Sequence, residues 1–363
     1  MRFKPQSGQP AYGTPPIYDS MGKRTYYGNF SWGGNPVKVG DSYHLFASMM
    51  PPGRNLSSWG SSLVDHAIAP NVSGPYVFNQ RTLTPGHNPA IMRLQNGSFA
   101  LFTILDYGVH VSDSPYGNWT KVVQAQDCKT HKQPLCYCNN PSPWLHKNGT
   151  IFLACGGGGP NVDGLWRSAN LTGPWTRVYS HSNFKHIRAD GNRPPVGGGF
   201  EDPHLWFDAD DNLHILFHAF CNEPVVVNAS CHGTLTSAHA FSTGDWSSDI
   251  SGELSWWVSP GVPYNSSVTT AAGETLYYWS RERPKIVWDD AGKMTHLITA
   301  VAPQPRAEDP TTRRYSSCRK GTSCSNCKGQ VFTETLFSEL DMTLKTDEVL
   351  APRHPAPVKN SIS

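Results

Sequence analysis

Short apolar runs alternate with turn residues along almost the whole chain. Five segments share one order of positions: a polar residue, a proline, an apolar run, a Gly/Asp/Asn turn and a second apolar run. They occupy residues 33–49, 86–104, 138–155, 200–220 and 281–301. Each predicts two strands joined by a hairpin, because apolar runs on both sides of a short polar turn are typical of β-hairpins. A second predicted hairpin follows each of the first four segments.

This repetition predicts an architecture. Two hairpins per repeat give a four-stranded sheet, which buries neither face until it stacks on a neighbour. The sequence therefore predicts an all-β fold, a five-bladed β-propeller with four-stranded antiparallel blades. We expect residues 1–28 to form an N-terminal segment, residues 29–341 the propeller and residues 342–363 a C-terminal tail. A β-sandwich with accidentally similar segments is the alternative.

The first strand of each repeat is predicted to line the central channel. Its proline fits a strand start, where a missing N–H costs no ladder bond; these prolines are Pro36, Pro89, Pro141, Pro203 and Pro284. The residues before them then converge at one mouth: Asn35, Asn88, Asn140, Asp202 and Arg283. Trp32, His87, Glu201, His204, Arg281 and Glu282 are close to them in the sequence.

These side-chain types favour a carbohydrate ligand. Amides and carboxylates bind hydroxyl groups, and an indole covers the apolar face of a sugar ring. Glu282 precedes Pro284 by the same offset as Glu201 precedes Pro203, so two glutamates are expected on neighbouring blades. The alternative is that the Asn and Asp residues only cap strand ends and turns.

Composition and charge exclude several classes of function. The net charge is +2 and no basic block occurs, which argues against a nucleic-acid partner. No apolar run approaches 18 residues, which argues against a membrane-spanning helix. Gly and Pro number 33 and 30, and they interrupt nearly every window in which a long helix could form.

Cysteines and glycosylation sequons predict a secreted protein. The chain has nine Cys and nine Asn-x-Ser/Thr sequons, more sequons than chance placement would give. We expect disulfides between Cys221 and Cys231 and between Cys318 and Cys324 or Cys327, and glycans at Asn71, Asn96, Asn118, Asn148, Asn170, Asn228 and Asn265. Zinc at Cys324 and Cys327 is the less favoured alternative, because no second pair has finger spacing. Residues 1–10 contain no apolar leader, so a secretory signal is expected to have been removed from this chain.

Three of the motifs resemble those of the five-bladed propeller glycoside hydrolases of family 43 and its relatives. There, blade one carries a general base in an Asp-Pro start, a later blade carries an Asp that tunes the acid, and blade four carries the general acid in Glu-x-Pro-His. Residues 201–204 match the acid motif, which implies that Glu201 is the general acid. Residues 34–41 and 139–141 match the other two, with Asn35 and Asn140 in place of aspartates.

An Asn cannot accept a proton near neutral pH, so three interpretations stay open. The first is a glycosidase with a displaced base, for which Asp202, Glu282 and Asp106 are candidates. The second is a non-catalytic glycan-binding protein, or a structural glycoprotein that self-associates in an extracellular assembly. The third is a polysaccharide lyase in which Arg281 and Arg283 bind a uronic acid.

No cofactor is predicted for any of these interpretations. No acidic loop has the spacing of a dedicated calcium site, so the sequence predicts no metal ligand. Related propellers sometimes hold calcium in the channel, and that alternative is left open by the resemblance.

Overall fold

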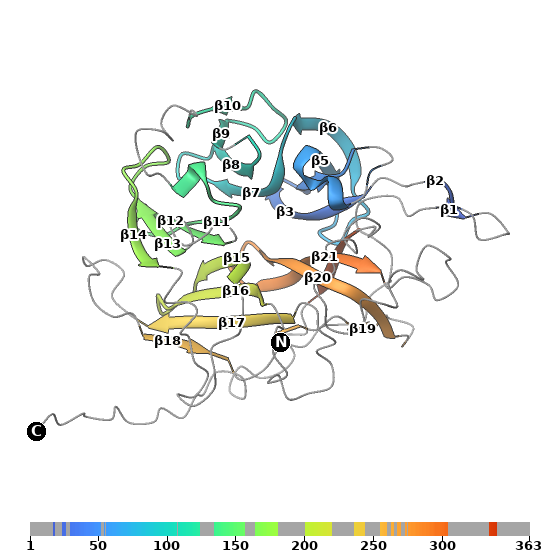
Figure 1. Cartoon of the computed structure of the whole chain (residues 1–363). Helices are drawn as coiled ribbons and strands as arrows, with labels where there is room; N and C mark the ends of the chain where they lie inside the picture. The colour runs from blue at the N-terminus through green and yellow to red at the C-terminus, as the bar shows by residue number, and fades with distance from the viewer. Residues whose placement is uncertain are drawn as a thin grey trace, which may run out of the picture.

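The computed structural model describes residues 17–18, 24–26, 30–51, 54, 56–106, 108–123, 134–156, 164–180, 200–219, 236–243, 255–259, 263–264, 267–269, 273, 275–303 and 334–339. Almost all regular structure in these ranges is β (Figure 1). The exceptions are two short 3-10 helices, η1 (Leu56–Ser61) and η2 (Pro134–Cys136). Within these ranges, no helix has the length and apolar character needed to cross a membrane.

Four antiparallel sheets have the same strand order, with each strand beside its neighbour in sequence. The first contains β3 (Ser31–Val39), β4 (Ser42–Met49), β5 (Leu63–Ala69) and β6 (Val77–Leu83). The second contains β7 (His87–Arg93), β8 (Phe99–Ile104), β9 (Gly108–Ser112) and β10 (Thr120–Lys121). The third contains β11 (Asn140–Leu145), β12 (Ile151–Gly156), β13 (Gly164–Ser168) and β14 (Thr176–Ser180). The fourth contains β15 (Phe200–Phe207), β16 (Leu213–Ala219), β17 (Thr236–Thr243) and β18 (Ser255–Val258).

The fifth sheet is built differently. It contains β19 (Ser267–Thr269), β20 (Thr275–Trp288), β21 (Met294–Pro303) and β22 (Glu334–Glu339). β19 pairs with the first residues of β20, whereas β21 pairs with the remainder of β20 and with β22. Only β20, β21 and β22 therefore take the positions of the first three strands of the other sheets. A separate ribbon of β1 (Ile17–Tyr18) and β2 (Arg24–Tyr26) completes the described strands.

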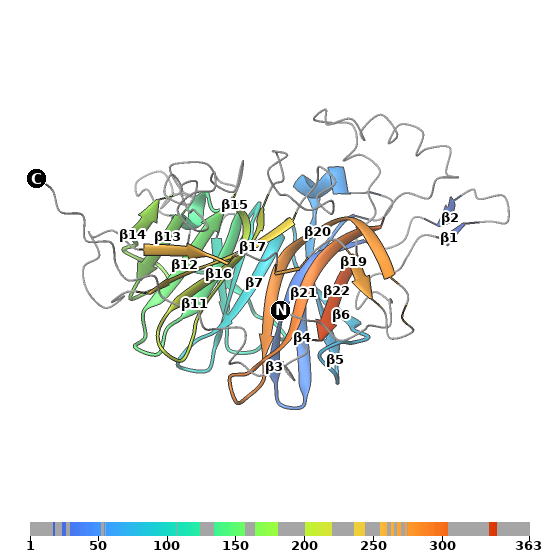
Figure 2. The same ribbon diagram turned by 90° about the horizontal axis from the view of Figure 1, so that it is seen from below.

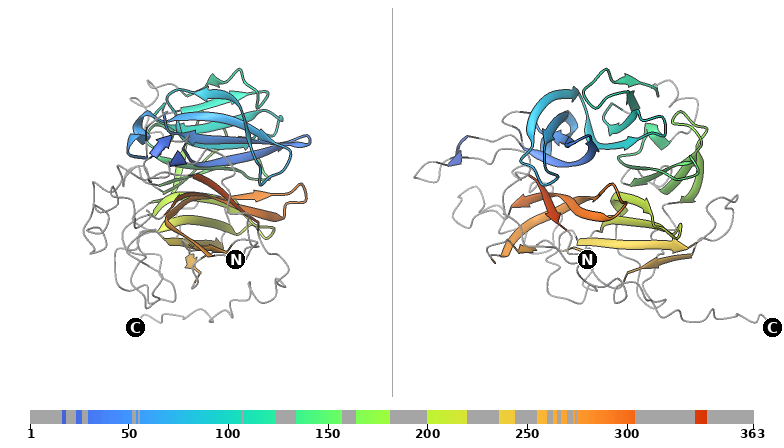
Figure 3. Two further views of the ribbon diagram at one scale, coloured as in Figure 1. Left: turned by 90° about the vertical axis from the view of Figure 1, so that its right-hand side faces the viewer. Right: turned by 180° about the vertical axis from the view of Figure 1, so that it is seen from behind.

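The sheets are arranged around a centre (Figure 1). Their inner strands β3, β7, β11, β15 and β20 contact one another in sequence order, and β20 also contacts β3. Figure 3 shows the first sheet beside the fifth, and Figure 2 shows the strands running between the two rims. The predicted all-β propeller with four-stranded antiparallel blades is confirmed.

The cores lie between adjacent sheets. One cluster joins the third and fourth sheets through Phe152, Leu165, Leu205 and Ile215, all fully or almost fully buried. Burying a large apolar side chain stabilises a fold by about 1.5–3 kcal/mol. The alternating apolar positions in the repeats therefore supply the contacts that hold each sheet against the next.

The inner strands carry bulges near the predicted strand starts. On β15 the pairing of Glu201 with His218 jumps to that of His204 with Leu216, and β7 and β20 show the same shift. Pro203 thus lies inside its strand, which corrects the expectation that the prolines begin strands. A bulge leaves a residue outside the ladder, so the missing proline N–H is tolerated there.

One disulfide lies within the described residues, between Cys138 before β11 and Cys155 on β12. The sequence did not single out this pair, although both cysteines belong to the third repeat. Cys136 is also disulfide-bonded. The predicted pairings of Cys221, Cys231, Cys318, Cys324 and Cys327 lie outside the described residues.

Candidate functional site

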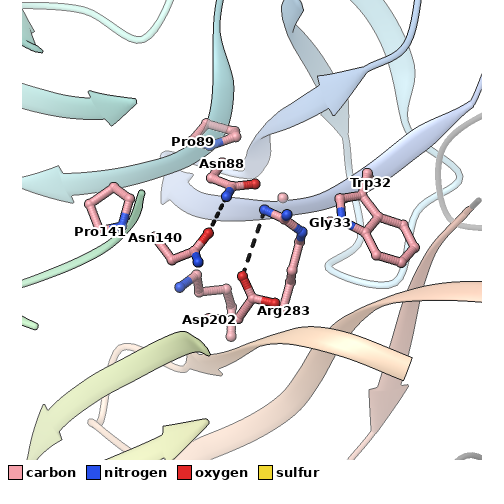
Figure 4. Close-up of a pocket in the computed structure, with 10 residues that line it drawn as sticks. Trp32, Gly33, Asn88, Pro89, Asn140, Pro141, Asp202 and Arg283 are labelled. Atoms are coloured by element: carbon pink, nitrogen blue, oxygen red, sulfur yellow. Dashed lines mark hydrogen bonds and ion pairs between the residues drawn. The ribbon is translucent and has the colours of Figure 1, made fainter. Parts of the chain in front are cut away.

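A small pocket lies where the five inner strands converge (Figure 4). It is lined by Trp32, Gly33, Gly34, Asn88, Pro89, Asn140, Pro141, Asp202, Arg283 and Lys285. Every inner strand contributes at least one of these residues. The repeats thus place Asn88, Asn140, Asp202 and Arg283 together, as the sequence predicted.

Blade one departs from the expected alignment. Asn88, Asp202 and Arg283 have positive φ angles of 49°, 51° and 57°, and the inner-strand residue of blade one with this conformation is Gly33, at 69°. Asn35 lies two residues further along β3 and is not among the lining residues. The bulge of blade one therefore contains Trp32 and Gly33, with the positive φ at Gly33, and Asn35 lies beyond it.

The hydrogen bonds of Asn35 support this alignment. Its Oδ1 accepts a hydrogen bond from the backbone N of Ile91 on the next blade, at 2.9 Å. Ser142 makes the corresponding contact on blade three, where its Oγ accepts from the backbone N of Leu205 at 2.9 Å. Asn35 therefore joins neighbouring inner strands, as Ser142 does.

Arg283 fills the space that a side chain at position 33 would take. A Cβ atom at Gly33 would lie 3.1 Å from Cδ and 3.2 Å from Cβ of Arg283. The guanidinium carbon stands 5.6 Å from the centroid of the Trp32 ring, a cation–π contact, and Nη1 lies 3.8 Å from Oδ1 of Asp202 (Figure 4). Arg283 thus links blade one to the carboxylate of blade four.

Two amides form the opposite side of the pocket. Asn88 donates from Nδ2 to the carbonyl oxygen of Asn139, at 3.0 Å, and to Oδ1 of Asn140 (Figure 4). Its backbone N donates to Oγ of Ser48 at 2.9 Å. Its Oδ1 is buried and has no hydrogen-bond partner in the described part of the chain. A buried acceptor at a pocket wall suits the hydroxyl of a ligand.

His218 lies next to the pocket at the centre of a carboxylate cluster. On β16 it pairs in register with Glu201, and its Nδ1 lies 3.6 Å from Oε2 of Glu201 and 3.6 Å from Oδ2 of Asp202. Burial lowers the pKa of His218, but the negative charges of Glu282, Asp202 and Glu201 outweigh it and raise the pKa to about 10. The buried imidazole is therefore a cation at neutral pH.

From the sequence, His218 and His296 lie near the ends of second strands and could point into the channel, but neither is among the predicted site residues. The position of His218 follows from the hairpin between β15 and β16. The register at the turn would place residue 218 opposite residue 202, and the bulge between Glu201 and His204 places it opposite residue 201. Pairing of the predicted hairpin was the available signal. Other histidines also lie in strands and have other roles, which made His218 difficult to single out. For example, Nε2 of His296 lies 3.1 Å from Oγ of Ser73.

The carboxyl groups of the cluster differ in environment. Burial raises the pKa of Asp202, but Arg283 and His218 lower it by more than burial raises it, so this group stays ionised. Burial raises the pKa of Glu282, and the charges of Asp202 and Glu201 add to the rise, against His218 and Arg283. The side chain of Glu201 is 35% exposed, whereas that of Asp202 is 3% exposed. Glu201 is therefore more accessible to a ligand than Asp202.

The spacing of Glu201 and Asp202 limits what they do together. Oxygen atoms of these two carboxyls and a ring nitrogen of His218 lie within 4.8 Å of one another. Carboxyl pairs of glycosidases stand about 5–5.5 Å apart in retaining enzymes and about 6.5–9.5 Å apart in inverting enzymes. Asp202 is therefore too close to Glu201 to hold a water on the opposite side of a sugar.

The same three groups have the donor types of a cation site. A metal would need the neutral form of His218, because a protonated imidazole offers no lone pair. The raised pKa of His218 disfavours that form, and its positive charge already compensates the carboxylates. A metal ion and a protonated His218 are therefore alternative counter-charges for this cluster.

The remaining predicted residues occupy other positions. His87 is buried, with Nδ1 at 2.7 Å from Oγ of Ser62, and burial and Arg283 hold its pKa well below the ordinary value. Arg281 is buried, donates from Nε to Oγ1 of Thr299 at 3.1 Å and stands over the ring of Tyr264. Of the two arginines expected to bind a uronic acid, only Arg283 lines the pocket.

Two further candidates also lie outside the lining residues. His204 faces a second cavity further along the channel. Asp106, a candidate base, has Oδ1 at 2.9 Å from Nζ of Lys121 and Oδ2 at 2.8 Å from Nε2 of His110. These ion-pair partners hold Asp106 in a local cluster of its own.

Comparison with known proteins bears on the fold. No family model matches the chain, and no curated protein matches it. Solved structures are similar to it. They include the catalytic domain of a family 62 α-L-arabinofuranosidase from Coprinopsis cinerea, with a TM-score of 0.54 and 12% identity over 93% of this chain and 97% of that chain.

Two other similar structures come from glycoside hydrolase family 43. A β-xylosidase/α-arabinofuranosidase from a compost microbial metagenome has a TM-score of 0.53 and 11% identity over 94% of this chain and 95% of that chain. An enzyme from Xanthomonas citri has a TM-score of 0.51 and 11% identity over 92% and 90%. At these identities the similarity establishes the propeller fold, and the chemistry has to be argued from the site.

Proposed function

We propose that this protein is a five-bladed propeller that binds a carbohydrate at the mouth of the central channel, over the small pocket, and hydrolyses a glycosidic bond there. The carrying observation is the group of Glu201, Asp202 and Glu282 around the buried cation of His218, beside a pocket lined by Asn88 and Asn140. The closed series of contacts from β3 to β20 and back supports five blades. The fifth blade would then lack a conventional outer strand among the described residues.

In this proposal Glu201 is the general acid. It is the accessible carboxyl of the pair it forms with Asp202, so it can reach a leaving-group oxygen. Asp202 stays ionised, holds Arg283 and accepts hydrogen bonds from sugar hydroxyls. Glu282 is the second carboxyl of the reaction, because it takes the register position of Glu201 on the neighbouring blade. Its raised pKa makes it a stronger base once it is ionised.

The substrate class is suggested by similar structures, which bear the names arabinofuranosidase and xylosidase. The experiment is to incubate the purified full chain with arabinoxylan, arabinan, xylan and a panel of other glycans. Released sugar and retained glycan are then measured separately. Release supports the hydrolase, and binding without release supports the second candidate below. If the protein releases no sugar and binds none of these glycans, the carbohydrate assignment is wrong.

The second candidate is a glycan-binding protein without catalysis. It is favoured by Gly33, because the blade-one position that carries a base in the resembled family has no side chain here, and Arg283 covers it. Sugar binding needs only hydrogen-bonding groups such as the amides and Glu201. Trp32, which the sequence predicted to cover a sugar ring, is 1% exposed and lies beneath Arg283, so it does not take that role. Proton transfer from water needs a carboxylate across the scissile bond.

Gly33→Asp separates these two candidates, with Asn35→Asp as the matched control on the same strand. Asp tolerates a positive φ better than most residues, and its Cβ would require Cδ and Cβ of Arg283 to shift by a few tenths of an ångström. In a binding protein, we expect Gly33→Asp to create weak hydrolysis and Asn35→Asp to create none. In a hydrolase that uses Glu282, Gly33→Asp should lower activity because it draws Arg283 away from Asp202. Equal effects of both variants on sugar release would contradict our alignment of blade one.

We also propose that the protein is a secreted glycoprotein. Asn71, Asn96, Asn118, Asn148 and Asn170 are all exposed and lie in turns or between strands. Asn228 and Asn265 lie outside the described residues. We expect glycans on several of the five exposed sites in protein from its native source, measured by mass spectrometry after enzymatic deglycosylation. A native chain without any glycan would contradict secretion.

A further inference from the structure

A second cavity, of about 290 Å³, lies further along the inner strands, toward their carboxyl ends. Its walls include Val37, Met92, Trp144 and Trp288, each of which follows the bulge or the start of its inner strand. Lys285 lines both this cavity and the pocket at Asp202. The cavity is thus the opposite side of the channel, and Lys285 stands between the two.

The cavity combines apolar walls with positive charge. The rings of Trp144 and Trp288 stand with centroids 5.9 Å apart and are accompanied by aliphatic side chains. Three lining residues are cations: Lys285 at the inner end, with Lys38 and Arg93 on the strands that form the walls. No carboxylate is among the described lining residues, although Lys38 has an exposed partner in Asp290 at 2.5 Å.

Two buried nitrogen atoms of residues that line this cavity have no hydrogen-bond partner among the described residues. They are Nε2 of His204 and Nε1 of Trp288. An indole N–H only donates, and a neutral imidazole donates from one nitrogen. A buried polar group without a partner is destabilising, so a ligand that supplies acceptor oxygens would stabilise the indole N–H and the imidazole.

The ammonium group of Lys285 can donate further hydrogen bonds to a ligand. Its Nζ donates to the carbonyl oxygen of Pro203 at 2.9 Å, and an ammonium group has three protons to donate. Burial lowers the pKa of Lys285 to about 8, so the group is still mainly protonated at pH 7. A ligand anion near Nζ would be held in a largely apolar surrounding, where charge-assisted hydrogen bonds are strong.

We propose that this cavity binds a small amphipathic carboxylate, with its apolar body against Trp144 and Trp288 and its carboxylate at Lys285 and His204. The volume is near the lower end for small-molecule pockets, which limits the ligand to about one ring with a short acid chain. A neutral apolar ligand would leave the donors unpaired. This site is distinct from the sugar pocket, because Asn88, Asn140 and Asp202 do not line it, although the two share Lys285.

The test uses 3-phenylpropionate as the probe and 3-phenylpropan-1-ol as its neutral counterpart. Binding to the full chain is measured by calorimetry and by tryptophan fluorescence, to which Trp144 and Trp288 contribute. We expect the acid to bind about tenfold or more tightly than the alcohol, as one charge-assisted hydrogen bond implies. Lys285→Met should abolish this preference and Lys285→Arg should keep it.

Val37→Phe and Asn88→Ala locate the bound probe. Val37→Phe narrows the cavity and should weaken binding about tenfold or more, whereas Asn88→Ala alters only the sugar pocket and should leave probe affinity unchanged. No binding of the acid at millimolar concentration, or equal binding of acid and alcohol, would overturn the proposal. So would weakening by Asn88→Ala without weakening by Val37→Phe. If Lys285→Met does not fold, the comparison of acid with alcohol and Val37→Phe still decides.

Discussion

Glu201→Gln is expected to remove glycosidic hydrolysis while leaving glycan binding in place. Glutamine keeps the size and the hydrogen-bonding capacity of glutamate, but its amide does not protonate a leaving-group oxygen. Loss of a general acid lowers kcat by roughly 10²–10⁴-fold. Initial rates on the glycan that wild type cleaves, together with affinity by calorimetry, measure the two effects separately.

Asp106→Asn is the matched control for this prediction. Asp106 is also a partly exposed carboxyl, but its partners Lys121 and His110 hold it outside the pocket lining. We expect Asp106→Asn to keep sugar release within a few-fold of wild type. If Glu201→Gln cleaves as well as wild type, the assignment of the acid is wrong. If Asp106→Asn instead loses activity, Asp106 is the displaced base.

The proline motifs predicted much of the fold and of the pocket, and there are physical reasons for what they did not predict. They located the inner strands and placed Asn88, Asn140, Asp202 and Arg283 together. The motifs failed on blade one. There the residue with a positive φ is Gly33, which lies two residues before Asn35 and is not followed by a proline. A proline marks a bulge only when that bulge contains it, and Pro36 lies beyond the one on β3.

Other features depend on contacts between segments that the repeats do not encode. His218 reaches Glu201 across a hairpin, and its role comes from three carboxylates that burial brings together. The cavity at Lys285 depends on the width of the channel, which is set by packing of the inner strands. The pairing of β19 with the beginning of β20 also has no counterpart in the first four repeats.

The cation at His218 also links the site to stability, because without it the three partly buried carboxylates would keep only the charges of Arg283 and Lys285, which act on Asp202. His218→Asn removes the cation and leaves Glu201, Asp202 and Glu282 together. Removing one partner of a buried ion pair costs about 3–5 kcal/mol. We therefore expect the free energy of unfolding at pH 6 to fall by about this amount, measured by urea denaturation.

The pH dependence identifies His218 as the cause. Its pKa rises from 6.5 in the unfolded chain to about 10 in the folded protein, so its stabilisation is complete below pH 6.5 and is lost as the pH rises toward 10. Wild type should lose stability over this interval, and His218→Asn should lose much less. His66→Asn is the matched control, because burial and His44 lower the pKa of His66 to about 4 and its contribution is lost only as the pH falls below 6.5. An unfolding free energy of wild type that stays constant between pH 6.5 and 10, or the same decline in His218→Asn, would show that the buried histidine is not the cation that holds the carboxylates together.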